Sequence, residues 1–175
     1  MKVMECSLPG VKVIETDCFN DERGRFLENY RLSLYKDIDI NYNFVQDNIV
    51  HSKKNVLRGL HFQKMYPQGK LISVIEGEIF DVAVDINKNS RTYGNWVGEN
   101  LSFDNHKQLF IPPGYAHGYC VLSDSASIMY KCTEYYFKND QNGIIWNDSN
   151  INIDWPIVNP IISKKDSKLP TLLKS

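Results

Sequence analysis

The chain has 175 residues, of which 42% are hydrophobic and 23% charged, so it is long enough to bury a core, and we expect one domain over residues 1–175. Its 20 Lys and Arg nearly cancel its 21 Asp and Glu, for a formal net charge of −1, which argues against a nucleic-acid binder, since such proteins carry basic faces. No apolar run approaches the roughly 20 residues of a membrane span and no signal segment is recognisable, so we expect a cytoplasmic protein without a membrane partner.

Short strand patterns dominate the chain, and helix patterns are few. Alternation and β-branched or aromatic residues predict strands over 11–15, 43–50, 55–63, 95–103, 107–111, 118–122 and 127–136. Short helical segments are expected over 31–38 and 163–172. Residues 144–156, which contain two tryptophans, form a turn-rich arm that we expect either to pack on the core or to form an interface. Many short strands separated by turns indicate a sandwich, barrel or jelly roll.

Residues 70–86 are predicted to form a β-hairpin that turns at Gly77. In the second half of this segment, Asp81 and Asp85 fall on the same face as two small or aliphatic residues, because side chains alternate along a strand. The other face is apolar throughout, with Phe80, Val82, Val84 and Ile86. A face that carries two acids suits the wall of a barrel whose interior binds a ligand.

Four polar residues lie close together in strand-like sequence: Arg58, His61, Gln63 and Lys70. A single histidine in a strand is usually a hydrogen-bonded core residue. His61 and Gln63, however, share a strand face, with Arg58 and Lys70 nearby, and unpaired buried charge is costly. We therefore expect these side chains to line a polar cavity rather than an apolar core.

The spacing of cysteines and histidines does not indicate a metal site. The four cysteines are Cys6, Cys18, Cys120 and Cys132, with no C-x-x-C pair, and we expect free thiols, buried for the two in apolar strands. Zinc and iron sites need three or four ligands. Gln63 stands where a second histidine after His61 would complete an H-x-H pair, and His117 in IPPGYAHGY is isolated. We therefore expect no metal.

Taken together, several segments resemble the dTDP-4-dehydrorhamnose 3,5-epimerases, the dTDP-sugar isomerase family of cupins. They occur in the family's order over residues 19–166. The matching stretches are FNDERGRFLENY, FVQDN, NVLRGLHFQ with QGKL, GEIFDVAVDI with SRTYGNW, LFIPPGYAHGY, and YKCTEYY with IIWND, IDWP and SKKD. The resemblance implies an all-β cupin jelly roll (a double-stranded β-helix) with a few short helices, assembled as a homodimer that exchanges N-terminal strands.

The family's chemistry removes protons at C3 and C5 of a hexose, both α to a ketone at C4. Such a reaction needs a base, a group that stabilises the enolate oxygen, and an acid on the opposite face of the ring. By resemblance His61 is the base, Asp166 its carboxylate partner, and Tyr130 the acid. Lys70 is expected near the C4 oxygen. No cofactor is implied.

Binding residues follow from the same resemblance. Arg23 and Arg58 are expected at the diphosphate, where the planar guanidinium suits phosphate oxygens. The remaining expected contacts are with the base, nucleoside or sugar: Phe26, Glu28, Gln46, Asn48, His117 and Tyr136. Phe26 and Glu28 are expected to reach across the dimer.

The resemblance therefore predicts an isomerase that converts dTDP-4-keto-6-deoxy-D-glucose to dTDP-4-keto-L-rhamnose, in dTDP-L-rhamnose biosynthesis. Three alternatives remain at this point. The first is a sibling epimerase that acts at C3 only or on another nucleotide-diphospho-sugar, such as a GDP-heptose or CDP-deoxyhexose. The second is a metal-dependent cupin, which the missing H-x-H pair disfavours. The third is a non-catalytic sugar-binding cupin.

Overall fold

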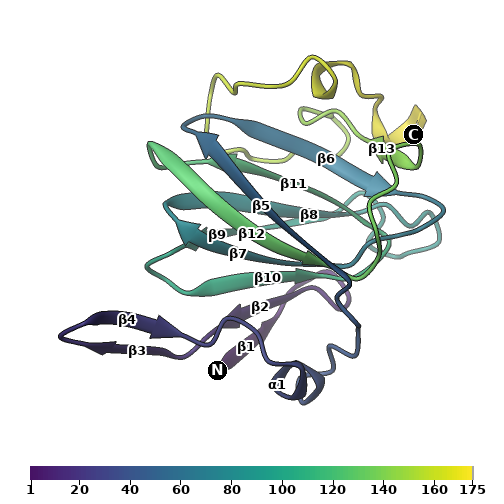
Figure 1. The fold of residues 1–175 in the computed structure, drawn as a ribbon. Helices are drawn as coiled ribbons and strands as arrows, with labels where there is room; N and C mark the ends of the chain where they lie inside the picture. Colours follow the sequence, from purple (N-terminus) through teal and green to yellow (C-terminus); the bar gives the residue numbers. More distant parts are fainter. Residues whose placement is uncertain (175) are drawn as a thin grey trace.

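A computed structural model describes residues 1–174 and shows two antiparallel sheets packed face to face, the jelly roll of the cupins (Figure 1). The larger sheet contains, in spatial order, β1 (Lys2–Glu5), β2 (Lys12–Glu15), β10 (Lys107–Ile111), β7 (Lys70–Glu76), β12 (Ser125–Cys132) and β5 (Gln46–Lys53). The smaller sheet contains β13 (Gln141–Gly143), β6 (Leu57–Gln63), β11 (Tyr115–Val121), β8 (Glu78–Asp85) and β9 (Trp96–Ser102).

The core lies between the sheets and is built from the inward-facing residues of both. Ile72 and Leu109 of the larger sheet and Ile79 and Val121 of the smaller sheet belong to this cluster and are almost completely buried. Burying one such side chain contributes about 1.5–3 kcal/mol. The same two walls continue into a polar cavity, so the apolar core holds the cavity-lining strands in place.

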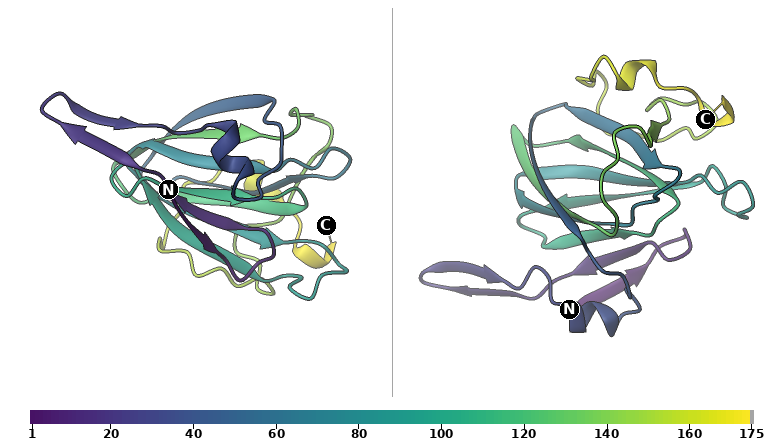
Figure 2. Two further views of the ribbon diagram at one scale, coloured as in Figure 1. Left: turned by 90° about the horizontal axis from the view of Figure 1, so that it is seen from below. Right: turned by 45° about the vertical axis from the view of Figure 1, so that its right-hand side comes forward.

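The C-terminal arm covers the outer face of the smaller sheet (Figure 2). Leu60 and Val82 of the sheet pack there with Ile144, Trp155 and Leu172. The tryptophan arm is thus core packing, the first of the two expected roles. The arm ends in two 3-10 turns, η1 (Asp166–Lys168) and η2 (Leu172–Lys174), which confirms the helical turns predicted over 163–172.

A short helix and the loop after it cover part of the outer face of the larger sheet. This helix is α1 (Leu32–Lys36), as predicted within 31–38, and its buried Tyr35 packs with Ile14 and Phe110. The hydroxyl of Tyr35 hydrogen-bonds to the side chain of Gln108 on β10. These contacts anchor the chain just after the N-terminal hairpin.

The prediction of a hairpin over 70–86 is wrong. β7 pairs with β10 and β12, whereas β8 pairs with β11 and β9, so the two halves belong to different sheets. The chain crosses between sheets at Gly77, whose φ is +77° and where a Cβ would lie 2.1 Å from the Ser125 carbonyl oxygen. Alternation reports which face of a strand is buried, and it does not report which strand pairs with it.

Four strands were not predicted: β1, β13, and the hairpin β3 (Cys18–Asp21) with β4 (Gly24–Leu27). The hairpin forms its own two-stranded sheet and projects away from the body (Figures 1 and 2). The predicted strand over 127–136 ends earlier, at Cys132. All four cysteines are free thiols, and Cys120 and Cys132 are buried, as expected.

Candidate active site

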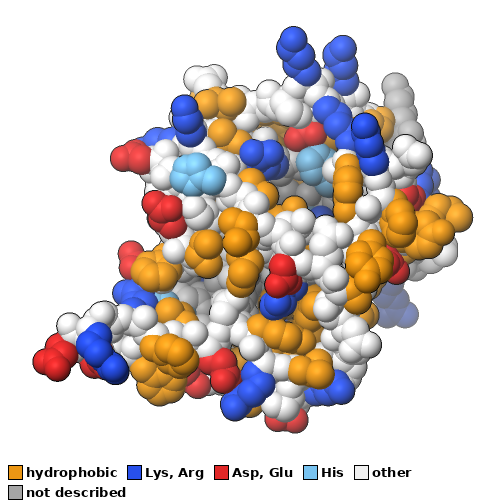
Figure 3. All heavy atoms as spheres, viewed as in Figure 1, with side chains coloured by type: hydrophobic (Ala, Val, Ile, Leu, Met, Phe, Trp, Pro, Cys, Tyr) orange, Lys and Arg blue, Asp and Glu red, His pale blue; other side chains and the backbone are white. Residues whose placement is uncertain are grey.

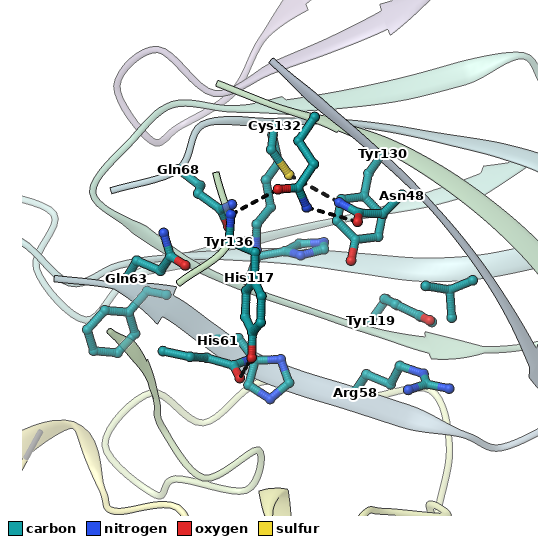
Figure 4. A pocket seen from close by; sticks show the side chains of 15 residues that line it. Asn48, Arg58, His61, Gln63, Gln68, His117, Tyr119, Tyr130, Cys132 and Tyr136 are labelled. Carbon is teal, nitrogen blue, oxygen red and sulfur yellow. Dashed lines mark hydrogen bonds between the residues drawn. The ribbon is translucent and has the colours of Figure 1, made fainter. Parts of the chain in front are cut away.

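A cavity of about 370 Å³ opens between the two sheets, and residues of both sheets line it (Figure 4). Figure 3 shows its mouth as a hollow in the upper part of the view, with histidine and basic side chains around it. The predicted residues that line it are Gln46, Asn48, Arg58, His61, Lys70, His117, Tyr130 and Tyr136. Side chains from segments far apart in the sequence therefore meet in one polar chamber.

His61 and Asp166 form a hydrogen-bonded pair at the wall built by β6. His61 Nε2 lies 2.8 Å from Asp166 Oδ1, and the Gly59 backbone N–H lies 3.4 Å from Asp166 Oδ2. Burial alone would raise the pKa of Asp166, but these interactions hold it below its ordinary value. Because the ionised carboxylate accepts a hydrogen bond from Nε2–H, the Nε2–H tautomer of the His61 imidazole is favoured, in which Nδ1 carries the lone pair.

An irregularity in β6 places Arg58 and His61 on the same side, although they are three positions apart in the chain. His61 pairs with His117 and Arg58 with Tyr119, so three steps on β6 match two on β11. This bulge lies at Gly59, whose φ is +131° and where a Cβ would lie 2.6 Å from Gly118 Cα. Only glycine fits this close approach of two backbones.

Tyr130 and Lys70 come from the opposite sheet. Figure 4 shows the Tyr130 phenol reaching toward the cavity from β12, with His61 and Arg58 on the facing strand. Burial raises the pKa of Tyr130 to about 12, so the phenol keeps its proton. Burial lowers the pKa of Lys70, and the charges of Cys132 and Asp81 oppose that effect. The cavity thus has a carboxylate-bound histidine on one wall and a protonated phenol on the other.

His117 forms a second histidine–carboxylate pair. Its Nε2 lies 2.8 Å from Oδ1 of Asp81, a residue of β8 with no exposed surface. Burial lowers the pKa of His117, and the nearby Asp81 opposes that effect. Sequence reasoning assigned no role to Asp81, although the acid-bearing face of residues 79–85 was the signal for it. That face does point into the interior.

The residues predicted to contact the nucleoside or sugar from β5 and the loop after β12 are connected by hydrogen bonds. Gln46 donates to Asn48 Oδ1 at 3.0 Å and accepts from the Tyr136 N–H at 2.9 Å. The Tyr136 hydroxyl donates to Gln141 Oε1 at 2.9 Å, and Gln141 is a cavity residue that the sequence analysis missed. Arg58 Nε donates to Ser52 Oγ at 3.2 Å. Burial raises the pKa of Tyr119, and its hydrogen bond with Ser52 and the nearby Arg58 oppose that effect.

Gln63 lines the cavity as expected, but the oxygen and nitrogen of its side-chain amide both hydrogen-bond to backbone groups. Its Nε2 donates to the carbonyls of Tyr66 and Tyr135, at 2.8 and 3.0 Å. Its Oε1 accepts from the Phe137 N–H at 2.7 Å. Gln63 therefore fixes the two loops at the cavity rim.

Three predicted binding residues lie outside the cavity of their own chain. Arg23 is on the β3–β4 hairpin and pairs with Asp21 at 2.5 Å. Phe26, on the same hairpin, has 67% of its surface exposed, and Glu28, just after it, pairs with Arg31 at 3.1 Å. The roles predicted for these residues require a second chain.

Within residues 1–174, no three His, Cys, Asp or Glu side chains are grouped in a way that would hold a metal ion. In the same described part of the chain, no helix is long and apolar enough to cross a membrane.

Comparisons with known proteins agree with this geometry. A family model described as dTDP-4-dehydrorhamnose 3,5-epimerase matches residues 5–174. The chain is 49% identical over 168 residues to the dTDP-4-dehydrorhamnose 3,5-epimerase of Shigella flexneri. The alignment covers 95% of this chain and 93% of that protein.

Solved structures agree as well. One similar structure is the dTDP-6-deoxy-D-glucose-3,5-epimerase of Legionella pneumophila Philadelphia 1, solved in complex with dTDP-4-keto-L-rhamnose. It superposes on this chain with a TM-score of 0.96 and 44% sequence identity, and the match covers 98% of this chain and 93% of that one. A 3'-monoepimerase of Streptomyces bikiniensis, in complex with dTDP-quinovose, has a TM-score of 0.90 and 26% identity, over 96% and 86% of the two chains. From the family match and these identities, the chain belongs to the dTDP-4-dehydrorhamnose 3,5-epimerase family.

Proposed function

We propose that this protein is an isomerase that converts dTDP-4-keto-6-deoxy-D-glucose to dTDP-4-keto-L-rhamnose, in the biosynthesis of dTDP-L-rhamnose. The observation that carries the proposal is the placement of the His61–Asp166 pair and Tyr130 on opposite walls of one cavity. Inversion at a carbon requires that a proton leave one face and return to the other. A base and an acid on facing sheets meet that requirement.

In the proposed reaction, Nδ1 of His61 takes a proton from a carbon next to the C4 ketone. The C–H electron pair forms an enolate, and the ionised Asp166 stabilises the imidazolium that results. Lys70 faces the oxygen that gains negative charge. Tyr130 then delivers its phenolic proton to the opposite face of the same carbon, and the enolate collapses to the ketone. The sequence repeats at the second carbon after solvent restores both protonation states.

The diphosphate is assigned to Arg58, whose terminal guanidinium nitrogens are not committed by its contact with Ser52. Gln46, Asn48 and Tyr136 are assigned to the nucleoside side of the substrate, because they form one hydrogen-bonded group at the cavity mouth. His117 is assigned to the sugar pocket.

Deuterium exchange tests the proposed activity. EDTA-treated protein is incubated with dTDP-4-keto-6-deoxyglucose in deuterium oxide, and deuterium at C3 and C5 is followed by NMR and mass spectrometry. Incorporation at both carbons supports the double epimerase. Incorporation at one carbon only would indicate instead an epimerase that acts at a single carbon, as the name of the 3'-monoepimerase relative describes. If neither carbon exchanges, the named substrate is wrong, and a panel of other nucleotide sugars then separates a sibling epimerase from a non-catalytic cupin.

We further propose a homodimer in which the β3–β4 hairpin of one chain completes the cavity of the other. The hairpin exposes Phe26 to 67% and Phe19 to 62%, and Ile49 on the outer face of the larger sheet is exposed to 68%. Large apolar side chains exposed to this extent are more typical of an interface than of a free surface. Arg23, Phe26 and Glu28 would thereby reach the partner's nucleotide. The free cysteines suit the reducing cytoplasm.

Mixing two inactive variants tests the dimer. Arg23→Ala removes a contact given to the partner, and His61→Asn removes the base of the chain's own cavity. In a mixed dimer one of the two sites has both native residues, so mixing is expected to restore activity that neither variant has alone. No recovery after subunit exchange, confirmed by mass-tagged subunits, rules out the shared site. Light scattering gives the oligomeric state independently.

A further inference from the structure

Asp81 is the buried carboxylate in the cavity wall to which the proposed reaction gives no part. It lies on β8 with no exposed surface, and its Oδ1 accepts a hydrogen bond from His117 Nε2 at 2.8 Å. Its second oxygen, Oδ2, is buried and has no hydrogen-bond partner among the residues that the structure describes. Unpaired buried charge of this kind is costly unless an opposite charge lies nearby.

Lys70 lines the same cavity as His117 from the facing sheet, and it is the cationic side chain that interacts electrostatically with Asp81. Burial lowers the pKa of Lys70, and electrostatic interactions with Cys132 on β12 and Asp81 on β8 oppose that effect without reversing it. Asp81 is the carboxylate among these groups, and it therefore favours the ammonium form of Lys70 against the larger effect of burial. Lys70 in turn lowers the pKa of His117, as does His61 on β6.

The same carboxylate decides what His117 can do. With burial lowering its pKa, His117 is neutral near neutral pH, and the Asp81 carboxylate accepts a hydrogen bond from its Nε2–H. Nδ1 then has a lone pair and no proton. A neutral His117 in this tautomer accepts a hydrogen bond from a substrate hydroxyl, and it does not donate one to an oxyanion.

We propose that Asp81 is a positioning residue of the epimerase site, which holds His117 as the neutral Nε2–H tautomer through their hydrogen bond and favours the charged form of Lys70, so that Lys70 rather than His117 stabilises the enolate oxygen. This inference rests on the proposed function. It assigns enolate stabilisation to Lys70 and gives His117 the role of a hydrogen-bond acceptor.

The variant Asp81→Asn tests this role, because it removes the charge and nearly preserves the shape. Loss of the negative charge lowers the pKa of Lys70, so the ammonium is lost at a lower pH. We expect exchange at C5 to slow by about 10-fold or more, and the alkaline limb of the kcat profile to move down by about one pH unit or more. Tyr130, with its pKa raised to about 12, does not titrate in that range.

Asp85→Asn is the matched control. Asp85 lies on the same strand and face and is equally buried, but it accepts from Thr92 Oγ1 at 2.6 Å and the Asn87 N–H at 2.9 Å in the loop after β8. We expect its pH profile to match that of the wild type. If the wild type is active and Asp81→Asn has the same rate and the same pH profile of kcat, the role inferred for Asp81 is wrong. The proposed function would then still stand. An inactive wild type overturns the function itself.

A measurement on the unmodified protein covers the case in which Asp81→Asn does not fold. Long-range ¹H–¹⁵N NMR reports the tautomer and charge of each histidine. We expect His117 to be neutral with its proton on Nε2 at neutral pH. An imidazolium, or a proton on Nδ1, would overturn the inference.

Discussion

His61 Nε2 lies 2.8 Å from Asp166 Oδ1, although the two residues are 105 positions apart in the chain. The contact exists because the C-terminal arm packs on the outer face of the smaller sheet and returns to β6. The Ile161 carbonyl accepts from the Leu57 N–H at 3.0 Å, and the Leu60 carbonyl accepts from the Ile144 N–H at 2.9 Å. The arm thus delivers a buried carboxylate to the histidine from behind the cavity wall.

Asp166→Asn is expected to reduce epimerisation by at least about 100-fold while leaving the fold intact. An amide does not stabilise the imidazolium, and it can turn its NH₂ toward His61 and select the wrong tautomer. The measurement is the initial rate of deuterium incorporation at C5. Asp124→Asn makes the same charge change on a fully exposed side chain and should leave the rate unchanged. Equal rates for Asp166→Asn and wild type would remove Asp166 from the mechanism.

Tyr130→Phe is expected to separate proton exchange from inversion. His61 still removes a proton and returns one to the same face, so we expect exchange within about 10-fold of the wild type, whereas inverted product falls by at least about 100-fold. Mass spectrometry follows the exchange, and coupling constants in the NMR spectrum report the configuration.

The control for this variant is Tyr135→Phe, since Tyr135 is 56% exposed and is not among the residues that line the cavity. It should behave as the wild type in both assays. Inverted product formed by Tyr130→Phe at the wild-type rate would show that another group, or water, supplies the second proton.

Local patterns in the sequence predicted most strands and the polar character of the cavity. The alternation over residues 79–85 correctly separated the interior face of Asp81 from the apolar face of Val82, because period-two alternation follows directly from strand geometry. The pairing of β7 with β8 was wrong, because Gly77 permits a crossing between sheets as readily as a tight turn.

Long-range contacts were beyond local patterns. Asp166 was assigned by family resemblance alone, since nothing in its surroundings distinguishes it from an exposed tail residue. Asp81 was placed on the correct face without a partner, because its contact with His117 depends on the register of β8 against β11. The positions of Arg23 and Phe26 outside their own cavity depend on how the hairpin projects, which local patterns do not indicate; the family resemblance alone predicted that Phe26 reaches across a dimer.

Asp148→Asn is expected to destabilise the protein by about 1–3 kcal/mol at neutral pH. The carboxylate is buried and accepts backbone hydrogen bonds from Asn150 at 2.7 Å, Ile151 at 3.2 Å and Leu172 at 2.7 Å. Burial alone would raise the pKa of Asp148, but these N–H donors hold it below its ordinary value. Denaturant unfolding monitored by tryptophan fluorescence gives the difference in free energy.

The pH dependence of that difference has a definite sign. A carboxylate whose pKa is lowered in the folded state stabilises the protein above its unfolded pKa of about 3.9, and this contribution is lost as the pH falls through the folded pKa. The effect of Asp148→Asn should therefore be largest near neutral pH and shrink in acid. Asp154→Asn, on an exposed side chain of the same arm, should show little effect at any pH. An Asp148→Asn difference that grew in acid would contradict the assignment.

Gly59→Ala is expected to destabilise the protein more than Gly114→Ala. Both glycines have positive φ, +131° and +97°, so both variants are strained by about 1–3 kcal/mol. A Cβ at Gly59 would also lie 2.6 Å from Gly118 Cα, whereas one at Gly114 meets nothing within 4 Å. We expect a further loss of about 1–3 kcal/mol for Gly59→Ala in denaturant unfolding. Equal losses would mean that β6 and β11 separate without penalty, and the bulge would then not be what keeps Arg58 and His61 on one side.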